Sequence, residues 1–357
     1  MNKYWSETIK GIVPYVPGEQ PRAGRVVKLN TNENPYPPSE AVLEAMKAAI
    51  TDRLKLYPDS NCTLLRHEAG SYYGISPDMI FAGNGSDEIL AFCYKAFFDP
   101  GDCLLIPDIT YNFYEVYADL FGIRYLSVPL ATDFEVPVQA FRSACDGIIL
   151  ANPNAPTGKA LPLTAIEDLV KNHPEAVIIV DEAYVDFGAE SALPLLPLYD
   201  NLLVVRTFSK SRSLAGLRIG LAMGHPDLIE ALIRVRDCVN CFTVDWIAQA
   251  GAIASLRDEA TFRRNLASIT GTRSKATSRL RTAGFKVIDS STNFLMASCP
   301  GLPAKELYEA LRSRNMFVRF FPKPRIDQYL RITIGTDEDM DILLDALIDL
   351  TKTMGIK

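Results

Sequence analysis

Along most of the chain, short continuous apolar runs alternate with segments of helical periodicity. Continuous apolar runs without alternation are typical of strands buried on both faces, as in a parallel sheet covered by helices. Between the first two runs, residues 87–98 place their apolar side chains on one helical face, and residues 162–171 predict a similar helix. This order predicts an α/β fold with a mostly parallel sheet. The predicted strands are residues 79–82, 103–106, 147–151, 177–180, 202–206 and 218–222.

After residue 250 the pattern changes to shorter apolar runs and amphipathic segments, which predicts a smaller α+β domain. Residues 1–40 are rich in Pro, Asn and Gly, and they predict an extended arm that packs with the small domain or a partner subunit. We therefore expect this arm, a large domain at 41–250 and a small C-terminal domain at 251–357, linked by a helical stretch at 242–278. The elements predicted for the small domain are strands at 285–288, 293–297, 316–320 and 329–334 and helices at 302–314 and 338–354.

Composition and charge narrow the class of protein. Of the 357 residues, 48% are hydrophobic and 22% are charged, as in a soluble globular protein with a large core. The net charge of −6 argues against a nucleic-acid partner, because such proteins need basic side chains to neutralise phosphates. No apolar run approaches the ~20 residues that span a bilayer, and residues 1–10 lack the apolar stretch of a signal peptide. We expect a soluble, cytoplasmic protein with no membrane partner.

The seven cysteines and three histidines predict no metal site. Cys238 and Cys241 form a lone C-x-x-C pair, and no further ligands follow at the spacing of a zinc site. Most cysteines lie beside apolar residues, where a thiol acts as a small buried side chain. The cysteines therefore indicate a reducing compartment.

Candidate functional residues follow the predicted strands, because an open parallel sheet binds ligands at the carboxyl ends of its strands. Residues 83–88 read Gly-Asn-Gly-Ser-Asp-Glu between a strand and a helix. Gly85 lets the backbone approach a ligand, and the amides of Ser86 and Asp87 at a helix N-terminus favour a phosphate. The segment matches no nucleotide-binding fingerprint, and an ordinary capped turn is the alternative.

Asp181 and Tyr184 follow the predicted strand at 177–180. A carboxylate at the end of a buried strand is costly without a cationic or hydrogen-bonding partner, and a protonated pyridine nitrogen would be such a partner. Tyr184 follows within one short turn and could hydrogen-bond the same ligand. The alternative is that Asp181 caps the next helix.

The next strand leads into a segment that is dense in hydroxyls and cations around Lys210. A lysine forms a Schiff base when cationic neighbours lower its pKa, and Ser209 and Arg218 suit a phosphate. A solvated basic loop is the alternative, although the pattern S-K-x-x-x-L-A-G-L-R is long and specific. Residues 152–158, after another strand, form either a bare turn or a loop whose asparagines reach a ligand.

These segments together supply what pyridoxal phosphate (PLP) needs from a protein. PLP requires a phosphate anchor, a partner for its pyridine nitrogen, a partner for its phenolic oxygen and an amine for the imine. The occurrence of all four in order, each after a strand, is more specific than any one motif. The sequence therefore predicts a PLP enzyme.

With these residues in view, the chain resembles the class I and II aminotransferases of PLP fold type I. The resemblance covers almost the whole chain, from Tyr15 in V-P-Y-V-P-G and the segment K-L-N-T-N-E-N-P at 28–35 to L-R-I-T-I-G at 330–335. It includes Y-P-D at 57–59. The fold that it implies has a large PLP-binding domain, a smaller C-terminal domain and an N-terminal arm.

The resemblance implies a role for each candidate residue. Lys210 would form the Schiff base and then move the proton between the substrate's Cα and the cofactor. Asp181 would pair with the pyridine N–H⁺, Tyr184 would hydrogen-bond the phenolic oxygen, and Tyr111 would stack on the ring. Tyr57 would reach the cofactor phosphate of the neighbouring subunit, so a homodimer is implied. The phosphate of the chain's own cofactor would be held by Gly85, Ser86, Asp87, Thr207, Ser209 and Arg218.

The resemblance also implies a substrate. Arg331 would bind the carboxylate of glutamate or 2-oxoglutarate bidentately, and Tyr15, Asn32 and Arg319 are candidates for the rest of the substrate site. Within the family, the chain is most similar to the subgroup that acts on L-histidinol phosphate. The implied reaction transfers the amino group of L-histidinol phosphate to 2-oxoglutarate, giving imidazole acetol phosphate and glutamate in histidine biosynthesis.

Other activities remain open at this point. An aminotransferase of phenylalanine or tyrosine shares these motifs, and so does a PLP-dependent decarboxylase of O-phosphothreonine. A non-enzymatic regulatory protein of the same fold is opposed by the intact Lys210, Asp181 and Arg331. The chain also departs from the family in having Ala155 before Pro-Thr-Gly, where an asparagine usually binds the phenolic oxygen. Either Asn154 replaces that contact, or Tyr184 makes it alone.

Overall fold

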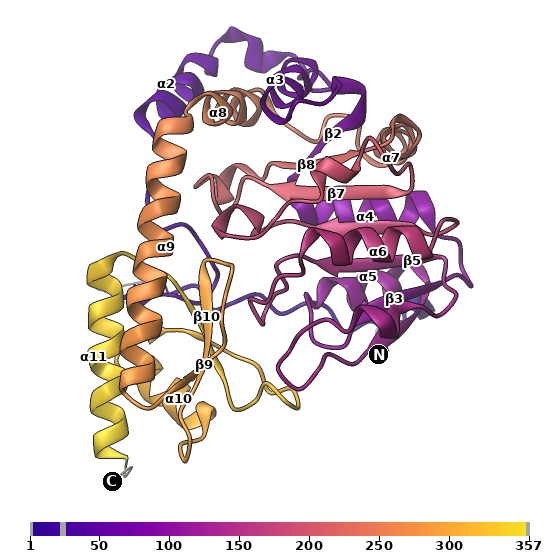
Figure 1. Ribbon diagram of the computed structural model, residues 1–357. Coiled ribbons are helices and arrows are strands. Elements are labelled where there is room, and N and C mark those ends of the chain that lie inside the picture. Colours follow the sequence, from indigo (N-terminus) through magenta and orange to yellow (C-terminus); the bar gives the residue numbers. More distant parts are fainter. Residues whose placement is uncertain (1–2, 22–25, 355–357) are drawn as a thin grey trace.

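The computed structural model describes residues 3–21 and 26–354. The chain forms a large sheet between layers of helices, and a smaller sheet lies beside it with the long C-terminal helices against it (Figure 1). The predicted α/β fold with a mostly parallel sheet is therefore confirmed. In the described residues, no helix is long and apolar enough to cross a membrane.

The larger sheet has the strand order β2-β8-β7-β6-β5-β3-β4 in the described part of the chain. β8 runs antiparallel to both of its neighbours, and the other pairings are parallel. The carboxyl ends of β5, β6 and β7 therefore lie together at one edge of the sheet. The strands are β2 (Ile80–Gly83), β3 (Cys103–Pro107), β4 (Arg124–Val128), β5 (Gly147–Ala151), β6 (Val177–Asp181), β7 (Leu202–Thr207) and β8 (Gly220–Gly224).

Two strands of the large sheet differ from the sequence prediction, and the strand predicted at 316–320 is divided into β11 (Met316–Phe317) and β12 (Arg319–Phe320). β4 was not expected, because this edge strand exposes Arg124, Leu126 and Ser127 and so lacks a continuous apolar run. β8 begins at Gly220 rather than at 218, because Arg218 adopts a left-handed conformation (φ 55°) that interrupts the extended chain.

Both faces of the large sheet are buried, which explains the continuous apolar runs. Successive side chains of a strand point to opposite faces, so Ile178 and Val180 of β6 pack in one core and Ile179 packs in the other. The core around Ile179 includes helices α4, α5 and α7, and the opposite core includes α2, α3, α6 and α8. These helices are α2 (Glu40–Ala49), α3 (Thr63–Tyr73), α4 (Gly85–Phe97), α5 (Phe113–Phe121), α6 (Leu163–Asn172), α7 (Pro226–Val239) and α8 (Trp246–Arg257).

The smaller sheet has the order β12-β13-β10-β9, and its pairings are antiparallel. Helices α9 and α11 run side by side against it (Figure 1), and Arg279 of α9 forms ion pairs with Asp341 and Asp345 of α11. The predicted boundary at residue 250 lies inside α8, so the limits of the domains stay a prediction. The elements here are β9 (Lys286–Val287), β10 (Phe294–Ser298), β12 (Arg319–Phe320), β13 (Leu330–Thr333), α9 (Glu259–Thr282), α10 (Ala304–Ser313) and α11 (Asp337–Thr353).

The N-terminal segment contains a short helix, α1 (Glu7–Gly11), and a short strand, β1 (Val27–Lys28). β1 pairs in parallel with β11 (Met316–Phe317), and the backbone amide of Leu29 donates to the carbonyl of Phe317 at 2.7 Å. The segment after β1 is thereby held against the small sheet, at the same edge where the strands of the large sheet end.

Candidate active site

A cavity of about 360 Å³ opens at the carboxyl ends of β5, β6 and β7. Its lining also includes Tyr15 from the N-terminal arm and Arg331 from β13 of the small sheet. The arm and both sheets therefore meet around one space. The sequence-predicted residues that line it are Tyr15, Asn32, Ser86, Asp87, Tyr111, Asp181, Tyr184, Thr207, Ser209, Lys210, Arg218, Arg319 and Arg331.

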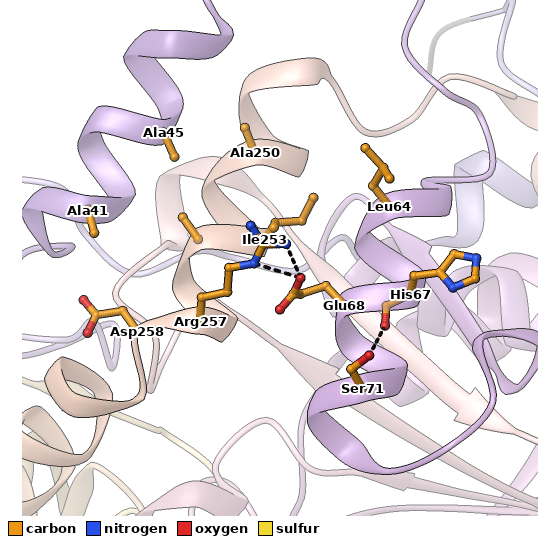
Figure 2. Close-up of a pocket in the computed structure, with 11 residues that line it drawn as sticks. Ala41, Ala45, Leu64, His67, Glu68, Ser71, Ala250, Ile253, Arg257 and Asp258 are labelled. Carbon is orange, nitrogen blue, oxygen red and sulfur yellow. Dashed lines mark hydrogen bonds and ion pairs between the residues drawn. The ribbon is translucent and has the colours of Figure 1, made fainter.

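A larger cavity, about 760 Å³, lies between α2, α3 and α8 (Figure 2). Two of its charged side chains, Arg257 and Glu68, bind each other, with Arg257 Nε 2.9 Å from an oxygen of Glu68. The described residues that line it include no lysine or tyrosine, and several are alanines. The smaller cavity is therefore the candidate active site, because it holds the reactive and titratable groups.

Lys210 lies just after β7 and lines the cavity. Its Nζ donates to the backbone oxygen of Thr31 at 3.2 Å and lies 5.9 Å from the centre of the Tyr184 ring. This partner is a carbonyl rather than a carboxylate. A lysine amine in a cavity can act as a nucleophile and form an imine.

Asp181 is the last residue of β6 and is buried. One carboxylate oxygen accepts a hydrogen bond from the Tyr114 hydroxyl at 2.9 Å, and the other accepts from the backbone amide of Ala183 at 3.1 Å. Burial raises the pKa of Asp181 to about 6, although both hydrogen bonds oppose the rise. The residue is thus a buried acid that faces a cavity, and a cationic ligand group there would favour its ionised form.

Helix α4 begins at the cavity, and its cap residue, Asn84, makes no side-chain capping bond. The amides of Ser86 and Asp87 in the first turn can therefore bind an anion, which the helix dipole also favours. Gly85 has φ 83°, and a Cβ at this position would lie 2.6 Å from Nη2 of Arg218. Glycine is thus needed for the guanidinium to lie at the start of the helix.

Arg218 is held beside this helix start by two side chains. Its Nη2 donates to Asp87 at 3.0 Å, and its Nη1 donates to the Ser209 hydroxyl at 3.3 Å. The Thr207 hydroxyl donates to the same Ser209 oxygen at 3.0 Å. A guanidinium, two hydroxyls and an uncapped helix N-terminus therefore converge, as an anion such as a phosphate requires.

Two tyrosines line the cavity between these groups. The Tyr111 hydroxyl donates to Asp87 at 2.9 Å, and burial raises the pKa of Tyr111 well above its ordinary value. The Tyr184 hydroxyl accepts a hydrogen bond from the side-chain amide nitrogen of Asn32 at 2.9 Å. The side-chain oxygen of Asn32 in turn accepts from the Thr333 hydroxyl at 3.0 Å. Because its oxygen accepts from Asn32, Tyr184 can direct its own hydrogen toward the cavity. Asn32, predicted to bind substrate, thus holds Tyr184 in place.

Arg331 and Arg319 lie on the side of the cavity formed by the small sheet. Arg331 donates from Nη2 to the backbone oxygen of Asn30 at 3.0 Å, and its buried Nε has no hydrogen-bond partner. Burial lowers the pKa of Arg331. A buried guanidinium with an unsatisfied donor is costly unless an anion binds it, so this side of the cavity suits a carboxylate. Arg319 donates to the backbone oxygen of Val16 at 3.0 Å.

Of the sequence-predicted residues, Gly85, Asn154 and Tyr57 do not line this cavity. The Asn154 side chain accepts from the Thr110 hydroxyl at 2.8 Å and donates to Ile109 O at 2.9 Å and to the Thr157 hydroxyl at 3.0 Å. We therefore correct its assignment as a ligand contact, because its amide is used to hold the loop. Ala155 lines the cavity instead, and Tyr57 is 77% exposed and stacks on Phe242.

Sequence reasoning missed several residues of the site, and three of them contact or face its functional groups. Tyr114 bonds Asp181, Asn30 bonds Arg331, and Phe321 lines the cavity while Arg331 lies over its ring. A partial signal existed for Tyr114, which follows Tyr111 by three residues in the same tyrosine-rich segment, although Tyr111 lies before helix α5 and Tyr114 lies in it. No local pattern marks the other two, because their partners are distant in sequence.

The residues present fit PLP. The anion site at α4 suits its phosphate, Asp181 suits its ring nitrogen, Tyr184 suits its phenolic oxygen, and Lys210 is an amine in the same cavity. In the described residues, no group of three or more His, Cys, Asp or Glu side chains could hold a metal ion.

Comparison with known proteins agrees with this geometry. The model of the family "Aminotransferase class I and II" matches residues 24–347. A histidinol-phosphate aminotransferase of Clostridium beijerinckii is 48% identical over 347 residues, which covers 97% of each chain. Histidinol-phosphate aminotransferase 1 of Pseudomonas aeruginosa is 49% identical over 347 residues, or 97% of this chain and 99% of that one. The crystal structure of histidinol-phosphate aminotransferase from Sinorhizobium meliloti, in complex with pyridoxal-5'-phosphate, is similar with a TM-score of 0.90 and 24% identity, and covers 99% of both chains.

Proposed function

Because the chain belongs to the class I and II aminotransferase family, we propose that it uses PLP to transfer the amino group of L-histidinol phosphate to 2-oxoglutarate. The products are imidazole acetol phosphate and glutamate. The observation that carries this proposal is the convergence of Lys210, the buried Asp181 and the unsatisfied Arg331 on one cavity. Relatives about half identical over nearly their full length bear the name of this activity.

Each residue of the cavity has a task in this reaction. Bound PLP supplies an electron sink for the bond that breaks at the substrate carbon bearing the amino group. Lys210 removes the proton from that carbon as its general base. Asp181 holds a negative charge beside the ring nitrogen. Tyr184 donates to the phenolic oxygen, and it does so without help from position 155, where alanine has no donor.

The substrate side of the cavity accepts both reactants. Arg331 binds the carboxylate of glutamate or 2-oxoglutarate through its open Nε. L-Histidinol phosphate has no carboxylate, and its phosphate suits the cationic side formed by Arg331 and Arg319, with Tyr15 on the same lining. The rings of Tyr15, Tyr111 and Phe321 supply apolar surface for the imidazole ring.

Single-turnover spectroscopy tests this proposal. The PLP-loaded protein is mixed separately with L-histidinol phosphate, phenylalanine and O-phosphothreonine, and the absorbance band of the bound cofactor is followed. Rapid loss of the band with L-histidinol phosphate alone supports the proposal. Preference for phenylalanine would reassign the enzyme to aromatic amino acids. Release of carbon dioxide from O-phosphothreonine would identify a decarboxylase.

We also propose that the enzyme is a homodimer in which Tyr57 completes the partner's site. Tyr57 is 77% exposed and stacks on the ring of Phe242, which is also exposed. Other large apolar side chains in and around the segment between α2 and α3 are exposed as well, and exposed apolar surface suits a protein interface. The exposed residues that we assign to the interface are Ile50, Leu54, Leu56, Tyr57, Leu64, Val239 and Phe242.

Sedimentation equilibrium tests the homodimer. The wild-type protein should sediment at about twice the 39.5 kDa of one chain. Leu64→Glu, at a position 73% exposed in the proposed interface, should shift it to the monomer, whereas Leu198→Glu, at a position 65% exposed elsewhere, should leave it unchanged. Tyr57→Phe should weaken PLP binding in the dimer. A monomeric wild-type protein, or full PLP affinity in both Tyr57→Phe and Leu64→Glu, would refute the shared site.

We place the enzyme in the cytoplasm. The described structure has seven free cysteines, three of them buried, and no disulfide, which suits a reducing compartment. Subcellular fractionation with an antibody to the protein tests this placement, and recovery of the activity outside the cytoplasmic fraction would overturn it.

A further inference from the structure

The hydroxyl of Tyr114 makes a hydrogen bond that the reaction outlined above does not use. Tyr114 lies in the first turn of α5 with its side chain fully buried, and its hydroxyl donates to Asp181 Oδ2 at 2.9 Å. The hydroxyl of the buried Tyr94 donates to the backbone oxygen of Tyr114 at 2.7 Å, so a second buried hydroxyl bonds the same residue without bonding Asp181. Tyr114 does not line the cavity, but its hydroxyl bonds the carboxylate of Asp181, which does.

The surroundings of Asp181 otherwise disfavour a negative charge. Asp87 on α4 and the adjacent Glu182 repel it, and Cys93 on α4 is a buried neutral neighbour. Glu182 has its own cationic partner, because its Oε2 lies 2.9 Å from Nη2 of Arg206 on β7. The donors to Asp181 are the Tyr114 hydroxyl and the backbone amide of Ala183, so Tyr114 is the donor that a side-chain substitution can remove.

We propose that Tyr114 is a positioning residue that keeps Asp181 ionised and oriented toward the ring nitrogen of the cofactor. This inference rests on the proposed function, because it requires PLP in the cavity. A hydrogen bond to a buried charged group stabilises that charged form. Without it, Asp181 would keep its proton to a higher pH and would bind the protonated ring nitrogen less strongly. Tyr114 thus acts on the cofactor through Asp181 rather than by contact.

A pair of matched variants tests this inference. Tyr114→Phe keeps the buried ring and removes the hydroxyl that bonds Asp181, whereas Tyr94→Phe removes a buried hydroxyl that bonds only a backbone carbonyl. Cofactor-free wild type and both variants are titrated with PLP and with 1-deazapyridoxal phosphate, in which a carbon replaces the ring nitrogen. Dissociation constants are measured by quenching of tryptophan fluorescence, and the thermal unfolding midpoint of each protein is recorded.

The expected result is specific to the nitrogen. Tyr114→Phe should weaken PLP binding about tenfold, as expected for the loss of one hydrogen bond to a charged group, and should not weaken binding of the deaza analogue. Its PLP affinity should also fall more steeply than that of wild type as the pH is lowered. Tyr94→Phe should bind both compounds as wild type does. In an Asp181→Asn background, Tyr114→Phe should have no further effect on PLP binding, which keeps the test informative if the single variant folds poorly.

Three outcomes would overturn the inference: equal weakening for PLP and the deaza analogue, the same weakening in Tyr94→Phe, or unchanged PLP affinity in Tyr114→Phe. Failure of the wild-type protein to bind PLP at all would instead refute the proposed function. The two failures are therefore distinguishable.

Discussion

Replacing Asp181 by asparagine should stabilise the cofactor-free protein while it impairs the enzyme. Burial raises the pKa of this carboxyl from 3.8 to about 6, which corresponds to about 3 kcal/mol against the ionised form at about 1.4 kcal/mol per tenfold change in proton binding. Asparagine is uncharged and can still pair with Tyr114, whose hydroxyl both donates and accepts. Asp181→Asn should therefore raise the free energy of unfolding by about 3 kcal/mol near pH 8.

The sign of the pH dependence follows from the raised pKa. The folded protein binds the proton of the Asp181 carboxyl more tightly than the unfolded chain does. The contribution of protonated Asp181 to stability is therefore fully present below pH 3.8 and is lost as the pH rises through about 6. The advantage of asparagine should fall from about 3 kcal/mol near pH 8 to about half of that near pH 5.

Urea unfolding of cofactor-free wild type and Asp181→Asn at the two pH values measures this difference, at one fixed protein concentration because the proposed subunit association would also change stability. The same variant should lose most of its turnover with PLP, because a neutral amide cannot balance the protonated ring nitrogen. An Asp181→Asn protein that is no more stable than wild type near pH 8 would refute the reasoning from burial. Near-normal turnover would refute the pairing with the cofactor.

Other substitutions test the remaining parts of the site. Lys210→Ala should abolish both the imine absorbance band and turnover, and a variant that keeps either would refute its role as the imine-forming lysine. Gly85→Ala should weaken PLP binding at least about tenfold, because the new Cβ would lie 2.6 Å from Arg218 Nη2 at a residue with φ 83°. Equilibrium dialysis measures the PLP affinity, and an unchanged affinity would contradict the phosphate site. Arg331→Lys should raise the KM for 2-oxoglutarate about tenfold or more, because lysine cannot form the bidentate contact, and an unchanged KM in steady-state assays would move the carboxylate elsewhere.

Much of the site could be predicted from sequence because it is built from local segments. Gly85, Asp181 and Lys210 each follow an apolar run directly, and parallel strands bring their carboxyl ends to one edge. Arg331 was identified only through the family resemblance, because nothing in its local segment marks a carboxylate site. Its position in the same cavity as Lys210 depends on the packing of the small sheet beside the large one.

Other predictions failed where a distant partner decides what a side chain does. Asn154 has the residue type expected of a ligand contact, yet Thr110 and Ile109 use its polar atoms. Asn32 lines the cavity as expected of a substrate-site residue, and only the structure shows that it also bonds the hydroxyl of Tyr184. β4 escaped notice because an edge strand with one covered side has no continuous apolar run.

The sequence alone determined the alternation of buried strands and helices, and with it the α/β fold, because burial on both faces of a sheet requires continuous apolar runs. It also determined which strand ends carry an acid, a lysine and a glycine-rich turn. Only the tertiary structure decided which polar atoms remain unsatisfied in the cavity, such as Arg331 Nε, and which acid receives a buried hydroxyl, as Asp181 does from Tyr114. Hydrogen bonds are short and directional, so their partners are chosen by the packing of distant segments, which no local pattern contains.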